Sequence, residues 1–278
     1  MDRPRFSVAM CVYGKDNPSW FQAAVDSVLN QTAPPDEVVL VVDGPVPEVL
    51  ESIISEYAKN PIFKVVKLPT NEGHGNARRK SLDACTENLV ALMDADDIST
   101  PDRFEKQLQM MASGKIDIVG GNISEFIGQP ENIVGYRNLP ETDAEIKEYM
   151  KTRCPFNQVT VMFRKESYLK AGGYIDWHCD EDYYLWLRMA QENMVFANIP
   201  EVLVNVRVGE DMYKRRGGAK YFKSEAALQK YMLAKKIITP KTYILNVSKR
   251  LIVQVLLPSS IRGWVFKKFA RSNNHEKV

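Results

Sequence analysis

The sequence contains few of the residues that disulfide frameworks and structural zinc sites need. Its 278 residues include four cysteines and three histidines. No two cysteines stand at C-x-x-C spacing, and the gaps between them match no zinc-binding pattern. Likewise, His74 and His178 have no partner at metal-ligand spacing. Free thiols in a reducing compartment are therefore the simpler interpretation. The cysteines are Cys11, Cys85, Cys154 and Cys179.

Long hydrophobic runs are absent as well. The first five residues contain no apolar stretch, so we expect no signal peptide. No run approaches the roughly 18 apolar residues that a membrane span needs. The longest run near the C-terminus, Leu251–Leu257, is interrupted by Gln254 and stopped by Pro258. We therefore expect a cytoplasmic protein without a membrane-spanning helix.

The overall composition is ordinary for a globular protein, but the charge is unevenly distributed. Hydrophobic residues make up 45% and charged residues 26%, and the length allows one large α/β domain. From Lys241 to the C-terminus there are eight Lys or Arg residues against the single acidic Glu276. This local charge of +7 leaves −5 for the first 240 residues of a chain whose net charge is +2. A basic tail on a nearly neutral chain indicates a local electrostatic contact and not a nucleic-acid-binding protein.

The first half alternates strand and helix signals. Continuous apolar strands that alternate with helices predict a mostly parallel sheet covered on both faces. In such sheets the ligand binds beyond the carboxyl ends of the strands. The expected strands are Phe6–Tyr13, Glu37–Val42, Phe63–Leu68, Asn88–Met93 and Ile116–Val119. The expected helices are Pro18–Asn30, Glu48–Lys59, Gly75–Thr86 and one capped by Thr100-Pro101.

The second half has a different character. The Gly- and Asn-rich stretch Gly120–Asn138 predicts an antiparallel ribbon, and Thr142 with Glu145 forms a capping box for a helix. Strands are expected at Val159–Phe163 and Val202–Val208. The remaining expected helices are a short one ending at Gly172-Gly173, then Glu181–Glu192, Lys220–Lys235 and much of Lys241–Phe269.

The acidic motif Asp94-Ala95-Asp96-Asp97 directly follows a buried strand. Three carboxylates within four residues repel one another, which a bound cation or solvation relieves. Oxygen ligands suit Mg²⁺ or Mn²⁺, which commonly bridge to a substrate's phosphates. An acidic turn that caps the next helix explains the motif about as well.

Two further motifs carry charged side chains next to expected helix starts. The first, Asn71–Arg79, is rich in glycine and contains Arg78, so a phosphate could meet both the helix N-terminus and the guanidinium. It is neither a Walker loop nor a dinucleotide fingerprint, and taken alone a loop with solvated arginines is the better interpretation. The second, Asp180-Glu181-Asp182, is consistent either with a favourable helix dipole or with a carboxylate that acts as a base.

Taken in order, these pieces resemble the family 2 glycosyltransferases, which have the GT-A fold, a Rossmann-like sheet flanked by helices. The resemblance covers about the first 210 residues. It rests on Phe6–Tyr13, Ser27–Thr32, Val41–Gly44, Asn71-x-Gly73-x-x-x-Ala77-Arg78, Leu92–Asp97, Gly172–Tyr174 and Glu181–Arg188. It implies a GT-A domain at 1–210, with a nucleotide-sugar-binding half at 1–115 and an acceptor half at 116–210. A basic loop and a helical extension then occupy 211–278.

The resemblance also implies roles for the donor-binding residues. The donor is a nucleotide-sugar such as a UDP-sugar, and transfer inverts the anomeric carbon. Tyr13 and Asp43 would hold the nucleobase, Arg78 would contact the donor, and Asp94 would bind its ribose or base side. Asp96 would coordinate Mn²⁺ or Mg²⁺ across the diphosphate. The cation and Arg78 would stabilise the charge that develops on the leaving diphosphate.

On the acceptor side, Asp182 would be the catalytic base, while Glu181 and Trp186 would bind the saccharide or lipid-linked acceptor. No Gln-x-x-Arg-Trp motif is present, which favours transfer of a single sugar. The segment Met212–Gly218 resembles a loop of capsule, exopolysaccharide and O-antigen transferases of the family. Its residues Arg215 and Arg216 are candidates for closing over the donor phosphates.

The basic C-terminal tail interleaves cationic and apolar residues, which suits a helix lying at the inner face of the cytoplasmic membrane. An ordinary packing helix with a solvated basic face explains the tail equally well. Two other functions stay open. One is a haloacid dehalogenase-type phosphatase, although Ile98 stands where that family has Thr or Val. The other is a non-catalytic protein that binds sugar nucleotides or acts as a scaffold.

Overall fold

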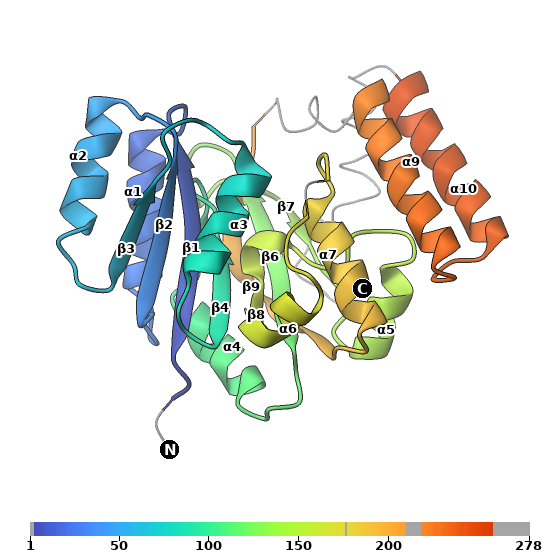
Figure 1. The fold of residues 1–278 in the computed structure, drawn as a ribbon, viewed down its shortest axis with the longest axis horizontal. Helices are drawn as coiled ribbons and strands as arrows, with labels where there is room; N and C mark the ends of the chain where they lie inside the picture. The colour runs from blue at the N-terminus through green and yellow to red at the C-terminus, as the bar shows by residue number, and fades with distance from the viewer. Residues whose placement is uncertain (1–2, 176, 210–217, 258–278) are drawn as a thin grey trace.

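The computed structural model describes residues 3–175, 177–209 and 218–257 (Figure 1). Its first half alternates strands and helices as expected. In chain order these are β1 (Phe6–Tyr13), α1 (Pro18–Leu29), β2 (Glu37–Asp43), α2 (Glu48–Tyr57), β3 (Phe63–Lys67), α3 (His74–Ala84), β4 (Leu89–Met93), β5 (Ile98–Ser99) and α4 (Arg103–Met111).

The second half adds shorter elements and the C-terminal helices. In chain order these are β6 (Ile118–Phe126), β7 (Ile133–Arg137), α5 (Asp143–Tyr149), η1 (Gln158–Thr160), β8 (Met162–Arg164), α6 (Lys165–Lys170), α7 (Glu181–Gln191), β9 (Phe196–Arg207), α9 (Ala219–Ala234), α10 (Pro240–Leu251) and the π-helical turn η2 (Ile252–Leu256). No helix within the described ranges has the length and apolar character that crossing a membrane requires.

A single sheet in the order β3-β2-β1-β4-β8-β6-β9-β5 organises the molecule, and β7 pairs with β6 outside this path. Strands β3, β2, β1 and β4 are parallel, as predicted. Strand β8 runs antiparallel to both of its neighbours, whereas β6 and β9 are parallel to each other. Strands β6 and β7 form the predicted antiparallel ribbon. The mixed α/β fold with a largely parallel sheet is therefore confirmed.

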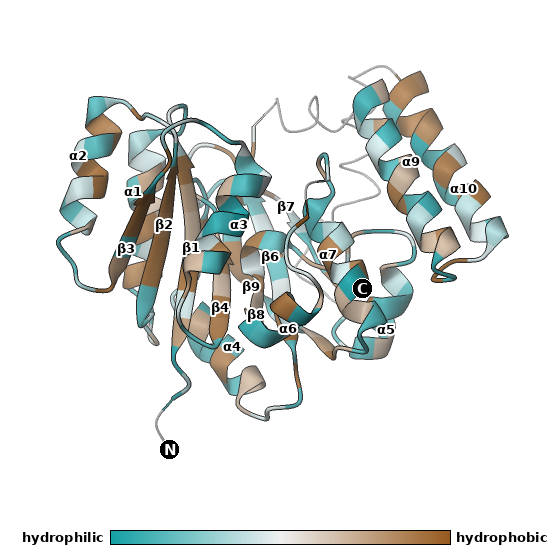
Figure 2. Cartoon of the chain, in the orientation of Figure 1, coloured by the Kyte–Doolittle hydropathy of each residue, from teal (hydrophilic) through white to brown (hydrophobic). Residues whose placement is uncertain are grey.

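Helices cover both faces of the sheet because successive strand residues point to opposite sides. Phe6, Val8 and Met10 of β1 pack with helices α1, α2 and α4. Ala9, between them, packs on the other face with residues of α3, α5, α6 and α7. Leu228 of α9 belongs to this second cluster, so the C-terminal helices share its core. Figure 2 shows that β2 and β3 are mostly brown, which marks hydrophobic residues.

Side-chain caps explain where several helices begin. The Asn17 side chain accepts hydrogen bonds from the backbone N–H groups of Ser19 and Trp20 at the start of α1. The predicted capping box of Thr142 and Glu145 is present at α5. Such caps satisfy backbone donors that have no partner within the helix.

Two sequence-based boundaries are wrong. Helix α4 is not capped by Thr100-Pro101 but begins at Arg103, because the backbone N–H and the hydroxyl of Thr100 both donate to the carbonyl of Leu203 on β9. The expected strand Val159–Phe163 starts instead as the 3₁₀ turn η1, and only Met162–Arg164 pairs in the sheet. In both places contacts with distant strands override the local pattern.

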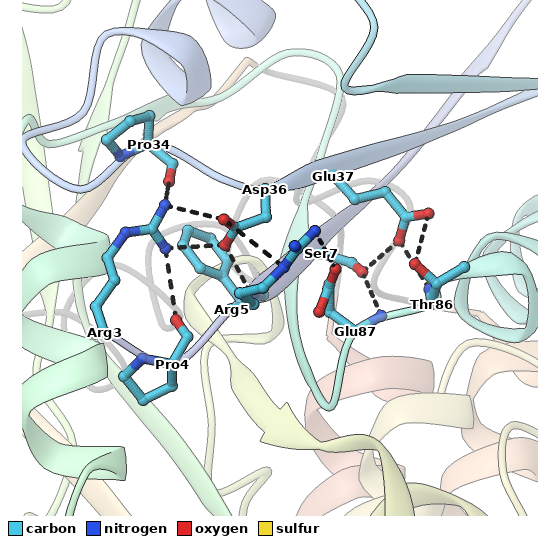
Figure 3. Close-up of polar contacts among 10 residues, drawn as sticks. Arg3, Pro4, Arg5, Ser7, Pro34, Asp36, Glu37, Thr86 and Glu87 are labelled. Atoms are coloured by element: carbon cyan, nitrogen blue, oxygen red, sulfur yellow. Dashed lines mark hydrogen bonds and ion pairs between the residues drawn. The ribbon is translucent and has the colours of Figure 1, made fainter. Parts of the chain in front are cut away.

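A polar network fixes the amino ends of the central strands, as Figure 3 shows. The Glu37 carboxylate accepts from the Ser7 hydroxyl at 2.5 Å and from the Thr86 backbone N–H at 2.8 Å, which joins β2, β1 and the segment before β4. Arg3 pairs with Asp36 at 2.9 Å. Because these contacts lie at the amino ends, the opposite carboxyl ends remain for the functional site.

Candidate active site

Predicted donor-binding residues meet where β1, β2 and β4 end. Tyr13 and Asp43 are the last residues of adjacent parallel strands and are direct register partners. The Tyr13 ring is exposed, as a residue that stacks on a base must be. Asp94 directly follows β4, which pairs with the other edge of β1. Three strands therefore bring these residues to one edge, as the parallel arrangement predicts.

Arg78, in the second turn of α3, is a buried cation at this edge. Its side chain is buried, and its Nη2 donates to Asp94 Oδ1 at 2.5 Å. The helix begins after Gly73, whose φ of 87° lies in the region that glycine adopts most easily. A buried guanidinium needs a partner of opposite charge, so the pair fixes the positions of both side chains.

The Asp43 carboxylate holds the loop that precedes α3. Its two oxygens accept from the backbone N–H groups of Glu72 at 2.7 Å and Gly73 at 3.1 Å, and the side chain is buried. A Cβ on the adjacent Gly44 would lie 2.6 Å from the backbone nitrogen of Asn71, so only glycine permits this close approach. The structure thus gives Asp43 a role in shaping the loop, whereas the sequence predicts that it contacts the nucleobase.

Besides Asp94, the acidic motif after β4 contains one exposed and one buried carboxylate. Asp96 is exposed, whereas Asp97 is buried and accepts from the backbone N–H of Arg207 at 2.8 Å. Burial, followed by the negative charges of Asp96 and Asp94, raises the pKa of Asp97 well above its usual value. The carboxylates of the motif therefore repel one another as the sequence predicts, and burial favours the protonated form of Asp97.

Arg207, at the end of β9, binds this motif from a strand that is distant in the sequence. Its Nε donates to the carbonyl of Asp96 at 3.2 Å, and its guanidinium lies 4.6 Å from the ring centres of both Trp20 and Phe126. Stacking between two rings restricts a long side chain that would otherwise move freely. The sequence analysis missed this residue, because no local motif links β9 to the acidic turn.

Asp16 is a second residue near the acidic motif that the sequence analysis missed. Its carboxylate accepts from the Tyr13 backbone N–H at 2.9 Å. Burial raises the pKa of Asp16 to about 6, and the charges of Asp96 and Asp94 contribute to this rise. Asp16 is therefore close to the acidic motif, and its position just after the first strand was the signal that could have identified it.

Asp182, in the first turn of α7, brings a carboxylate to the site from a different element. The Cys154 thiol lies 3.7 Å from its Oδ2, and the backbone N–H of Tyr183 donates to its Oδ1 at 2.6 Å. Burial raises the pKa of Asp182 above its usual value, although these contacts and the charges of Arg78 and Arg137 oppose the shift. A raised pKa makes a carboxylate a stronger base.

One cavity of about 700 Å³ is lined by residues of both acidic segments. Asp94 and Asp97 line it from the end of β4, and Asp180 and Asp182 line it from the start of α7. Helices α9 and α10 with η2 form a further wall, through Tyr221, Glu225, Lys249, Arg250, Val253 and Gln254. Asp94 and Asp97 of the acidic turn therefore share one cavity with the Asp182 carboxylate.

Comparison with known proteins identifies the family. Residues 7–173, more than half of the chain, match the sequence profile of Glycosyl transferase family 2. The chain belongs to glycosyltransferase family 2.

Two relatives support this membership, and one solved structure shares the fold. The Escherichia coli UDP-Gal:alpha-D-GlcNAc-diphosphoundecaprenol beta-1,3-galactosyltransferase is 36% identical over 271 residues, which cover 97% of this chain and 98% of that protein. The amylovoran biosynthesis glycosyltransferase AmsE of Erwinia amylovora is 38% identical over 232 residues, covering 83% and 86%. S. aureus TarS 1–349 in complex with UDP has a TM-score of 0.61 at 17% identity, covering 94% of this chain and 74% of that one. The GT-A fold expected from the sequence is thus confirmed.

The glycosyltransferase has few residues with which to hold a metal by itself. Among the described residues, no three His, Cys, Asp or Glu side chains are grouped so that they could hold an ion. The exposed carboxylate of Asp96 nevertheless stands between two cavity-lining aspartates. Mg²⁺ usually keeps several waters and takes one or two carboxylates together with substrate phosphates. The available metal ligands therefore fit a cation that binds together with the nucleotide-sugar.

The structure places the two predicted acceptor-binding residues in different environments. Glu181 lies beside the start of α3, because a Cβ on Gly75 would lie 4.0 Å from its Cγ. Trp186 is fully buried against Phe156 at 5.6 Å between ring centres, so it forms part of the core and the expected contact with an acceptor is wrong. The two arginines of the basic loop, Arg215 and Arg216, lie outside the described residues.

Three further residues line the cavity, and of these only His74 belongs to a motif that the sequence singles out. Arg137 of β7 donates to the carbonyl of Cys154 at 2.7 Å, and both residues line the cavity. His74 lines it as well, and the charge of Arg78, together with desolvation, lowers the pKa of His74 to about 4. The His74 ring is therefore neutral at neutral pH and can offer a hydrogen bond without adding charge.

Proposed function

We propose that this glycosyltransferase moves a single sugar from a UDP-sugar to a hydroxyl of a lipid-linked saccharide during bacterial surface polysaccharide biosynthesis, with inversion at the anomeric carbon. The observation that supports the proposal is the shared cavity, which both Asp94 and Asp182 line. An in-line displacement needs these two functions on opposite sides of the reacting carbon.

For the donor, the support comes from the edge formed by β1, β2 and β4. The exposed ring of Tyr13 is available to stack on a base, and the Arg78–Asp94 pair lies next to it. The E. coli relative is named for UDP-Gal, and TarS shares the fold in a complex with UDP. A UDP-sugar is therefore the first donor to test, with UDP-galactose the leading candidate.

A divalent cation, Mn²⁺ or Mg²⁺, would be held by Asp96 and would offset negative charge on the diphosphate. The chain's own residues complete this environment. Arg78 is held by Asp94, and the Asp96 carbonyl is held by Arg207. Because these side chains are already positioned, little reorganisation is needed when charge develops.

For the chemical step, Asp182 would accept the proton of the attacking hydroxyl. The acceptor oxygen forms a bond to the anomeric carbon, and the bond from that carbon to the diphosphate oxygen breaks. The electron pair leaves with the nucleoside diphosphate, and the proton is transferred to the carboxylate. The raised pKa of Asp182 suits this role, which is typically worth about 10²–10⁴-fold in rate.

For the acceptor, the support is the basic wall of the cavity. Arg137, Arg153 and Lys249 line it together with the acidic residues. The E. coli relative acts on a diphosphoundecaprenol-linked GlcNAc, so its acceptor carries two phosphates. Guanidinium and ammonium groups are the side chains that bind phosphates well. A diphosphate-linked saccharide would therefore find both a base and cations in this cavity.

A donor and acceptor panel tests the proposal. UDP-galactose, UDP-glucose, UDP-GlcNAc and GDP-mannose would each be incubated with Mn²⁺ and a synthetic GlcNAc-diphosphate carrying a short alkyl chain. We expect transfer from a UDP-sugar, with a product whose NMR coupling constant shows the β configuration. An α-linked product would exclude inversion. Binding of UDP without any transfer would favour the scaffold alternative, and release of inorganic phosphate from small phosphoesters would favour the phosphatase alternative.

A further inference from the structure

The outer face of α10 and η2 has an inverted distribution of polarity. The buried residues of this segment are polar, Asn246 in α10 and Gln254 in η2. Its exposed large side chains are apolar. They are Ile244, Leu245, Leu251, Ile252, Val255 and Leu256, here called the outer apolar face. Figure 2 shows the brown, hydrophobic turns of α10 at one end of the molecule. A contiguous exposed apolar surface on a folded protein usually marks an interaction site.

The positive charge around this face indicates that its partner is negatively charged. Lys241 and Lys249 are exposed on the same segment as the apolar side chains. In the sequence, residues 226–275 contain ten Lys or Arg residues and no Asp or Glu. Within α10 and η2 the apolar side chains are flanked by Lys and Arg, and this segment contains no Asp or Glu of its own. Such a segment complements a surface that is apolar inside and negatively charged outside. An anionic lipid bilayer has this character, and such helices lie in its interface.

The position of the segment links this surface to the active site. Lys249 and Val253 line the catalytic cavity, although neighbouring residues belong to the outer apolar face. Arg250 donates to Glu225 at 2.5 Å and to the carbonyl of Thr152 at 2.9 Å. Asn246 donates to the carbonyl of Lys151 at 2.9 Å. These contacts anchor the segment to the body, so a bilayer on its outer face would lie beside the cavity.

We infer that the outer apolar face docks the enzyme on an anionic membrane and thereby presents the cavity to a lipid-linked acceptor. This inference rests on the proposed function for the identity of the acceptor, but the docking itself can be measured separately. An acceptor with a long polyprenyl chain stays in the bilayer, so the enzyme must approach it there. The basic residues that line the cavity would then face the diphosphate that joins lipid and sugar.

Vesicle co-sedimentation of the full chain tests the docking. Vesicles of phosphatidylglycerol and phosphatidylcholine would be compared with vesicles of phosphatidylcholine alone. The test variant is Ile252→Gln with Leu256→Gln, whose side chains are 50% and 66% exposed. The matched control is Val49→Gln with Leu169→Gln, 61% and 56% exposed on other helices. A second test variant, Ile244→Gln with Leu245→Gln, guards against a folding defect in the first, and calorimetric UDP binding checks that each variant is folded.

We expect the wild type and the control to bind anionic vesicles, with binding to the test variants weaker by about tenfold or more. With the short-chain acceptor, all variants should retain wild-type turnover. With a polyprenyl acceptor in vesicles, the test variants should lose turnover in proportion to their binding. Equal vesicle binding by test and control variants would overturn the inference. The inference would also be overturned if the wild type formed a dimer that the test variants abolish, or if residues 258–278 were found to cover this face. Failure on both acceptors, with docking intact, would instead contradict the proposed function.

Discussion

Arg78 and Asp94 form a part-buried ion pair at the edge of the sheet where the donor is expected. The distance from Arg78 Nη2 to Asp94 Oδ1 is 2.5 Å, and Arg78 is only 5% exposed. Such a pair is sensitive to loss of one partner, because the other is left with an uncompensated charge. The pair also joins α3 to the end of β4, so the donor-binding edge depends on it.

Replacing Arg78 tests the importance of this pair for donor binding and transfer. Arg78→Ala removes the guanidinium and leaves Asp94 without its partner. We expect kcat/KM to fall by about 100-fold or more, because a positive charge near the leaving diphosphate is lost. The neighbouring Arg79 is exposed, so Arg79→Ala serves as the matched control. Steady-state kinetics with the preferred UDP-sugar measures both, and equal losses would contradict a specific role for Arg78.

Replacing Asp96 tests the metal prediction. Asp96→Ala should weaken Mn²⁺-dependent UDP binding by about tenfold or more, because the exposed carboxylate is the proposed protein ligand. Asp102→Ala serves as the control, because it removes a nearby aspartate that pairs with Lys106 and is not part of the acidic motif. Titration calorimetry with Mn²⁺ and with EDTA provides the measurement. If EDTA leaves UDP binding by the wild type unchanged, the cation has no part in binding.

Asp182 can be tested both by substitution and by pH. Asp182→Asn should retain UDP binding and lose about 10²–10⁴-fold in turnover, because the amide cannot accept the proton. In the wild type, a base with a raised pKa is protonated, and so inactive, at a higher pH than an ordinary aspartate. The acid side of the kcat/KM profile should therefore titrate above about pH 4, the ordinary Asp range. Unchanged turnover in Asp182→Asn would assign the base to another group.

Local patterns predict the fold well where burial and capping determine it. The strand Phe6–Tyr13 and the capping box at Thr142 agree with the structure residue by residue. The position of β8 between β4 and β6 is different, because it depends on pairing between strands that are distant in the sequence. The Thr100-Pro101 boundary fails for the same reason, since Thr100 binds Leu203 of β9. The division of the chain at residues 210 and 211 stays a prediction.

The candidate site is predictable only in part, because residue type does not reveal what surrounds a side chain. Asp94 and Asp182, which the sequence proposes as site residues, do line one cavity. Trp186 has the side chain of a sugar-binding residue, yet the packing of α7 buries it. Arg137 and Cys154 reach the cavity from β7 and the segment after α5, and nothing near them in the sequence indicates this.

Asp180 links stability to pH. Burial, followed by the negative charges of Glu225 and Asp182, raises the pKa of Asp180 to about 8 in the folded protein. In the unfolded chain an aspartate titrates near pH ~3.9. Between these values the folded state holds a proton that the unfolded state has released. The free energy of unfolding should therefore decrease as the pH rises from about 4 to about 8.

Asp180→Asn keeps the shape of this side chain and removes its titration. We expect the variant to be more stable than the wild type, and the gain in the free energy of unfolding should be larger at pH 8 than at pH 5 by roughly 1–3 kcal/mol. Urea unfolding followed by circular dichroism at both pH values measures the difference. The exposed Asp83 provides the control, because Asp83→Asn should change stability equally at the two pH values. A gain that is independent of pH would show that Asp180 is ionised throughout this range.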